Sequence, residues 1–256
     1  MPTLILTPRF TEDSQALGRA AARLGWDVER LRTWHVPEEL RSVPEPVLYL
    51  EALFGPSLAE PFGLRMLEPA VDWLPRLPEH FRKRRVDLMT LREARSLAAP
   101  CFIKPPNDKS FPAQVYAPKD LPEGYDEEMP VLVAEVVTWE KEFRCFILDR
   151  KLRTLSIYLR GNEVQRDSDF QAMDAELSEA SAFVQTVLDN EHVDLPRTAV
   201  LDVGVIEGRG WAVVEQNAAW GSGIYGCDPT EVLQVLRHAS VPVGSVPTTD
   251  EFRQVR

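Results

Sequence analysis

The sequence contains little of what a zinc site, a disulfide framework or a hydrolase triad requires. Only three cysteines occur among its 256 residues, Cys101, Cys145 and Cys227, and no two of them form a C-x-x-C pair. Few, widely separated cysteines argue against disulfides and structural zinc, and fit a reducing, cytoplasmic compartment. The four histidines have no ligand spacing, and the P-loop, G-x-S-x-G and H-E-x-x-H motifs are all missing.

The sequence also lacks long apolar runs. None approaches the roughly 20 residues that a membrane span needs. The first apolar run covers only residues 4–6 and follows no basic residues, which predicts a first β-strand rather than a signal peptide. Hydrophobic residues make up 44% of the chain and charged residues 27%, ordinary values for a globular protein. We therefore expect no membrane partner, and both a monomer and a homodimer remain open.

The charge balance excludes a basic footprint over the whole protein. The net charge is −11, so the sequence predicts no nucleic-acid partner. One local exception is the basic run at residues 81–85, which we interpret as a solvated helix end rather than a nucleic-acid patch.

The pattern of elements predicts an α/β (α+β) protein. Residues 1–50 show a β-α-β start, with a helix at about 13–24 that ends at Gly25. Further helices are expected at about 79–85 and 90–98, the second capped by Thr90. From residue 101 the pattern changes to β-hairpins, with later helices at about 172–190 and 230–238.

The hairpin predicted at residues 199–216 carries the most informative pattern. If residues 208–209 form a two-residue turn, Asp202 lies directly opposite Glu215, and strand alternation places Asn217 on the same face. Opposed carboxylates destabilise a sheet unless a cation lies between them. Two carboxylates and an amide oxygen are ligands suited to Mg²⁺. These three residues are the predicted metal ligands, with room left by Gly204; the alternative is an acidic, solvated strand face.

Two lysines follow from the next hairpin. Lys104 ends the apolar strand 101–104, and Lys109 lies in the loop after it. A lysine inside a buried sheet needs an anion, and ATP phosphates would supply one. The alternatives are a lysine that snorkels at a strand end and an ordinary loop lysine.

The strand predicted at residues 142–148 follows another strong strand, 131–137. Its apolar residues alternate, so Glu142 and Arg144 share the other face. They either form a simple salt bridge or line a site in which the carboxylate binds a ribose hydroxyl and the guanidinium a phosphate.

In this order and spacing, these residues resemble the ATP-grasp fold. Lys104, Glu135, Glu142 and the Asp202…Glu215-x-Asn217 set stand where that family has its phosphate-binding lysine, its hinge, its ribose-binding glutamate and its metal ligands. The motifs also resemble those of a small ATP-grasp clade named for an arginine and two lysines, seen in uncharacterised bacterial and phage-encoded proteins. The likeness covers about residues 73–236.

The resemblance implies an N-terminal α/β segment at residues 1–80 before an ATP-grasp domain at 81–256. That domain would contain a small lid subdomain at about 100–136 and a large subdomain at about 137–240. ATP and Mg²⁺ are the implied cofactors. The implied nucleotide contacts are Lys104, Lys109, Glu135, Val136, Val137, Glu142 and Arg144.

The activity implied by the resemblance is an ADP-forming carboxylate–amine ligase. ATP would convert a small-molecule carboxylate to an acyl phosphate, and an amine, from an amino acid or peptide, would then attack to form an amide. Arg144, Lys109 and Arg160 would be the catalytic residues. One departure concerns the lid, because no glycine occurs between Gly63 and Gly124.

Two other functions remain open at this point. One is a nucleotide-binding module without catalysis, and the other is a metal-dependent phosphohydrolase that uses Asp202 and Glu215. A dinucleotide-binding fold is disfavoured, although residues 221–226 match G-x-G-x-x-G, because one helix and no clear strand follow them.

Overall fold

The N-terminal part is a three-stranded parallel sheet in the order β2-β1-β3. It is seen in the computed structural model, which describes residues 1–107 and 109–245. β1 (Thr3–Leu6) pairs with β2 (Asp27–Arg30) and β3 (Pro46–Tyr49), and α1 (Glu12–Arg23) connects β1 to β2. The Thr11 side chain caps α1 by accepting from a backbone amide of its first turn. The predicted β-α-β start is confirmed.

The central element is a five-stranded antiparallel sheet in the order β11-β10-β9-β12-β13. Both predicted hairpins are present, and they meet because β9 pairs with β12 as well as with β10. The strands are β9 (Trp139–Leu148), β10 (Lys151–Arg160), β11 (Glu163–Val164), β12 (Thr198–Ile206) and β13 (Gly210–Asn217).

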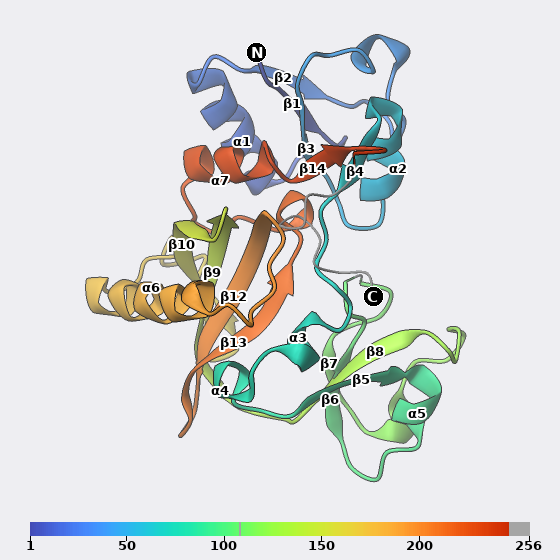
Figure 1. Ribbon diagram of the computed structural model, residues 1–256, viewed down its shortest axis with the longest axis vertical. Coiled ribbons are helices and arrows are strands. Elements are labelled where there is room, and N and C mark those ends of the chain that lie inside the picture. The colour runs from blue at the N-terminus through green and yellow to red at the C-terminus, as the bar shows by residue number, and fades with distance from the viewer. Residues whose placement is uncertain (108, 246–256) are drawn as a thin grey trace.

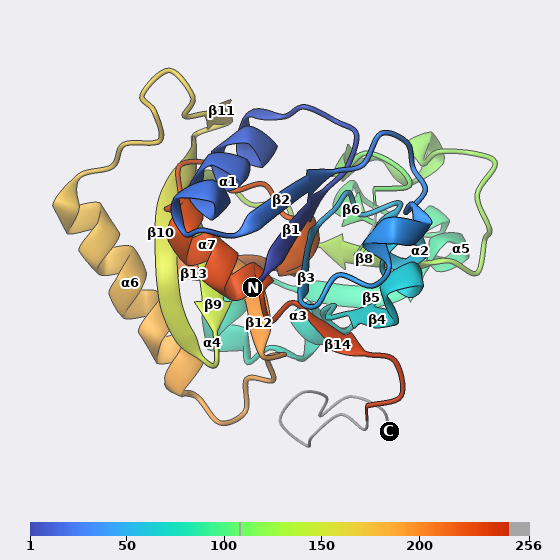
Figure 2. The same ribbon diagram turned by 90° about the horizontal axis from the view of Figure 1, so that it is seen from above.

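The two faces of this sheet bury different partners. α6 (Asp174–Asp189) packs on one face, over Phe143, Ile147 and Leu201. α7 (Pro229–Leu236) packs on the other face together with α1 and the N-terminal sheet, in a core that includes Phe146 and Val200. Figures 1 and 2 show α7 lying against α1, between the two sheets. The alternation of β9 is as predicted, so Glu142 and Arg144 share the face toward α7.

The C-terminal elements complete the N-terminal part. β14 (Ser240–Pro242) pairs with β4 (Leu64–Met66), and α7 packs beside α1. Elements on both sides of residue 80, where we expected a domain boundary, therefore share one hydrophobic core.

A four-stranded antiparallel sheet in the order β5-β8-β6-β7 forms the remaining part. Its helix begins at Thr90, which makes the predicted cap. The sequence did not predict β5, since Asp87 interrupts its short apolar pattern, and β8 ends three residues earlier than expected. The elements are β5 (Val86–Thr90), α5 (Leu91–Arg95), β6 (Cys101–Lys104), β7 (Gln114–Tyr116) and β8 (Pro130–Ala134).

The connections contain short elements. These are α2 (Gly55–Ala59), α3 (Trp73–Arg76), α4 (Glu79–Arg82) and 3₁₀ turns at 38–40, 60–62, 118–120 and 219–221. All three cysteines are free, as expected. Among the described residues, no helix has the length and apolar character needed to cross a bilayer.

The basic run at residues 81–85 is not a solvated helix end, because Arg84 is buried. β13 contains a bulge at Val214, since Asp202 pairs with Glu215 but Val203 pairs with Val213. The Arg84 guanidinium donates to the carbonyl oxygens of Val213 and Val214, each at 2.7 Å. Arg84 therefore satisfies the polar groups that the bulge leaves unpaired.

We predict that Arg84→Met lowers the free energy of unfolding by about 2–4 kcal/mol, because it strands two carbonyl groups that accept charge-assisted hydrogen bonds. Arg85→Met is the matched control, since the Arg85 side chain is 78% exposed, and its effect should stay within about 0.5 kcal/mol. Urea denaturation of the two variants measures both values. Equal, small losses would show that the bulge does not depend on Arg84.

Candidate functional site

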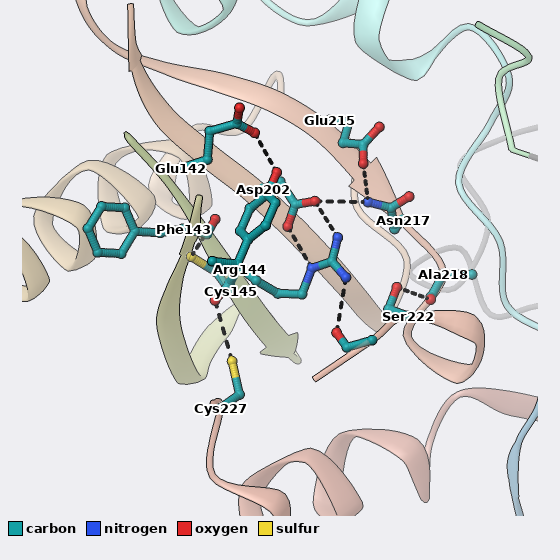
Figure 3. Close-up of polar contacts among 12 residues, drawn as sticks. Glu142, Phe143, Arg144, Cys145, Asp202, Glu215, Asn217, Ala218, Ser222 and Cys227 are labelled. Carbon is teal, nitrogen blue, oxygen red and sulfur yellow. Dashed lines mark hydrogen bonds and ion pairs between the residues drawn. The ribbon is translucent and has the colours of Figure 1, made fainter. Parts of the chain in front are cut away.

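The three predicted metal ligands lie together on β12 and β13. The structure pairs Asp202 with Glu215, as predicted. The predicted two-residue turn is wrong, because Ile206 pairs with Gly210 and a three-residue turn results; the bulge in β13 then restores the pairing. The Asn217 amide donates to Glu215 Oε1 at 2.8 Å and to Asp202 Oδ2 at 3.2 Å (Figure 3).

Asp202 forms a buried ion pair with Arg144 of the neighbouring strand. Arg144 Nε lies 2.9 Å from Asp202 Oδ1, and Nη2 lies 2.6 Å from Oδ2. Asp202 has no exposed surface, and the rings of Tyr158 and Tyr225 flank the guanidinium. Although burial by itself lowers the pKa of Arg144, the adjacent carboxylate raises that pKa above its ordinary value. The pair is therefore ionised.

Glu215 is paired with a different cation, Lys104 at the end of β6. Burial opposes ionisation of Glu215, but the Lys104 ammonium and the Asn217 amide hold its pKa at about 2. The expected repulsion between the two carboxylates is thus wrong for the protein alone, because each carboxylate has its own cation.

Glu142 does not pair with Arg144, so the simple salt-bridge interpretation is wrong. Its carboxylate accepts from the Tyr158 hydroxyl and is 8% exposed. Burial raises the pKa of Glu142 to about 7. The room predicted beside Gly204 is also filled, because a Cβ at that position would lie 2.6 Å from the Lys141 carbonyl oxygen and 3.1 Å from Glu142 Cγ.

These side chains border a cavity of about 250 Å³ between the central and the small sheets. Arg144, Glu215 and Asn217 reach it from the central sheet, and Lys109 reaches it from the loop after β6. Lys104 lines a smaller hollow that shares Glu215. Other lining residues, which the sequence did not single out, include Glu68, Asn107, Tyr158, Ser222 and Tyr225.

The loop at residues 221–226 closes one side of this cavity. The carbonyl oxygen of Gly223 accepts from Arg144 Nη1 at 3.0 Å, and the amide of Ile224 donates to Asp13 at 3.0 Å. The loop leads into α7 and then β14, which pairs antiparallel with β4. Its G-x-G-x-x-G pattern is therefore not the turn of a parallel β-α-β unit.

Two sets of predicted residues do not reach this cavity. Residues 135–137 follow β8, and the Glu135 carboxylate is paired with Arg209 at the β12–β13 turn. Arg160 donates to both carboxylate oxygens of Glu176 at 3.0 Å each. Because Glu176 belongs to α6, Arg160 is directed to the opposite side of the sheet, and we assign it no role in the site.

The donor set fits a hard divalent cation only in part. Glu215 and Asn217 offer oxygens at the cavity, whereas both Asp202 oxygens are engaged by Arg144. Within residues 1–107 and 109–245, no group of three or more His, Cys, Asp or Glu side chains is arranged to hold a metal. A Mg²⁺ ion here would need phosphate or water oxygens to complete its usual octahedral set.

A family model that describes an ATP-grasp domain, the second family of its clade, matches residues 81–235, well over half of the chain. The chain belongs to this family. The matched region contains both sheets that border the cavity, and it ends within α7. No curated protein is significantly similar in sequence.

Solved structures support the same ATP-grasp fold. The D-cycloserine synthetase DcsG is 15% identical with a TM-score of 0.60, over 93% of this chain and 98% of the other. D-alanine–D-alanine ligase from Bacillus anthracis, complexed with ATP, is 12% identical with a TM-score of 0.51, over 93% and 95%. A RimK-domain ATP-grasp protein from Sphaerobacter thermophilus is 14% identical with a TM-score of 0.50, over 93% and 98%.

We predict that Asp202→Asn lowers the free energy of unfolding by about 3–5 kcal/mol, because it leaves the Arg144 charge buried without its counter-ion. Glu215→Gln should cost clearly less, since Lys104 and Glu215 retain 15% and 26% side-chain exposure. Denaturation of both variants without nucleotide or metal tests the order. Similar losses would mean that Arg144–Asp202 is no more structural than Lys104–Glu215.

A second prediction concerns the pH dependence of stability. The raised pKa of Glu142 means that the folded state binds its proton more tightly than the unfolded state, so stability falls as pH rises from about 4.5 to about 7. The loss reaches about 3 kcal/mol above that window. Glu142→Gln should remove this part of the pH profile, whereas Glu163→Gln, an exposed control on β11, should retain it. Identical profiles for wild type and Glu142→Gln would contradict the assignment.

Proposed function

We propose that this protein is an ATP-dependent, ADP-forming carboxylate–amine ligase. Membership of the ATP-grasp family supports the use of ATP, and the similar structures include a D-alanine–D-alanine ligase and a D-cycloserine synthetase. The observation that carries the proposal is the cavity between the two sheets, where Lys109, Arg144, Glu215 and Asn217 converge.

The proposed nucleotide site uses charge exchange. Lys104 pairs with Glu215 in the protein alone, and ATP phosphates would take the lysine while Mg²⁺ takes the carboxylate. Each charge then keeps a partner, so binding strands no buried ion. Glu142 would accept a ribose hydroxyl, and the main chain at residues 136–137 would contact the adenine.

The proposed metal ligands are Glu215 and Asn217. When bound, Mg²⁺ would bridge ATP phosphates and offset the charge that develops during phosphoryl transfer. Asp202 would act by holding Arg144, since its two oxygens are committed to that guanidinium. This assignment revises the three-ligand set expected from the sequence.

The proposed chemistry has two steps. A carboxylate oxygen attacks the γ-phosphorus and ADP leaves, giving an acyl phosphate; the amine nitrogen then attacks the acyl carbon, loses a proton and expels phosphate. Arg144 uses three of its five N–H groups on Asp202 and Gly223, which leaves two for the acyl phosphate. Lys109 would bind the transferred phosphoryl group.

ADP release tests the ligase directly. Turnover that requires both a carboxylate and an amine, screened with amino acids and short peptides, is the expected result. ATP hydrolysis that proceeds without either substrate would favour a phosphohydrolase. Nucleotide binding without turnover on any pair would favour a binding module.

We predict that Lys109→Ala slows ADP release at least tenfold at saturating ATP and changes the Kd for ATP less, because its contact strengthens as charge develops on the transferred group. Lys119→Ala is the control, since Lys119 is exposed in the same small subdomain. Single-turnover rates and nucleotide titrations separate the two effects. A loss confined to ATP affinity would make Lys109 a binding residue only.

A further inference from the structure

A second cavity, of about 370 Å³, lies at the carboxyl ends of β1 and β3, against the first turn of α1. It adjoins the cavity described above, because Ala52, Lys109 and Gly221 line both. Its volume falls in the range of small-molecule sites, roughly 300–1,000 Å³. Apart from Lys109, it contains none of the residues assigned to ATP or Mg²⁺.

Glu51, immediately beyond β3, presents an unsatisfied carboxylate oxygen in this lining. Its Oε1 accepts from the Thr7 hydroxyl at 2.9 Å. Its Oε2 is buried and has no hydrogen-bond partner among the described residues. A buried carboxylate oxygen without a donor is costly, so a bound donor would relieve it.

A second carboxylate, Asp13, lies in the same lining and is fixed in place. It accepts from the amide of Ile224 at 3.0 Å and from the phenol of Tyr49. Burial and the nearby Asp13 charge raise the pKa of Tyr49, so the phenol remains a donor. Asp13 therefore ties the loop that carries the Arg144 contact to α1.

The nearby cations leave the Glu51 oxygen without a partner. Arg30 donates to the carbonyl oxygens of Thr7 and Arg9, at 2.9 and 2.5 Å, and so holds the loop after β1. Arg166 is ion-paired with Glu12 at 2.6 Å. Arg9 and Lys109 supply two further positive charges to the lining. The cavity thus combines two carboxylates with cations, a pattern that complements a zwitterion.

We propose that this cavity binds the amine co-substrate, a free α-amino acid or short peptide, whose ammonium group donates to Glu51 and Asp13. A carboxylate on the same molecule pairs with Arg9 and Lys109. The direction of the reaction rests on the proposed function, since the shared Lys109 places the amine beside the phosphoryl group. The binding chemistry itself rests on the cavity.

Isothermal titration of the full chain with the twenty amino acids and glycylglycine tests the proposal without turnover. At least one compound should bind, and its N-acetyl derivative, which lacks the ammonium group, should not. Its carboxamide derivative should bind more weakly. Glu51→Gln should weaken binding about 10- to 100-fold, the range expected for one charge-assisted hydrogen bond, and should leave ATP affinity unchanged.

Glu29→Gln is the matched control, because Glu29 is exposed on β2 of the same sheet. It should bind like wild type, and thermal melting of both variants checks that each is folded. Binding by no compound in the panel, or equal binding by wild type and Glu51→Gln, overturns the proposal. Failure of wild type to bind ATP would instead contradict the proposed ligase, while the dependence on Glu51 would still support the amine site.

Discussion

The buried ion pair between Arg144 and Asp202 links the main parts of the molecule. It joins the neighbouring strands β9 and β12 with no exposed surface on the carboxylate. A third contact of the same guanidinium holds the carbonyl of Gly223, and the next residue, Ile224, donates to Asp13 on α1. A buried charge that loses any of these partners is costly. The central sheet, the loop before α7 and the N-terminal helix therefore depend on one another.

This constraint explains how an acidic cluster can exist in the protein without bound ligand. Asp202 and Glu215 lie opposite each other, yet Arg144 and Lys104 neutralise them from β9 and β6. The two pairs differ in exposure, since Asp202 is fully covered and Glu215 borders the cavity. Ligand exchange is therefore far easier at Glu215. The fixed pair orients Arg144, and the accessible pair leaves Lys104 and Glu215 ready to change partners.

Local pattern predicted much of the fold, and non-local pairing limited the rest. Alternation along residues 142–148 correctly put Glu142 and Arg144 on one face. Their interaction was misjudged because the partner of Arg144 comes from β12, 58 residues away, and the sequence does not reveal that β9 lies between the two hairpins. The Asp202–Glu215 pairing was predicted from a wrong turn, whose extra residue is offset by a bulge. Arg84 was missed for the same reason, since only the fold brings it to that bulge.

The N-terminal sheet gains its importance from where its strands end. Ligand sites in open parallel sheets form outside the carboxyl ends of the strands, where the chain order reverses. Here β1 lies between β2 and β3, and Thr7 and Glu51 follow β1 and β3 on the side that faces the central sheet's cavity. Lys109, from the small sheet, lines both cavities. All three sheets thus meet at one lysine, and movement of its loop would alter both cavities together.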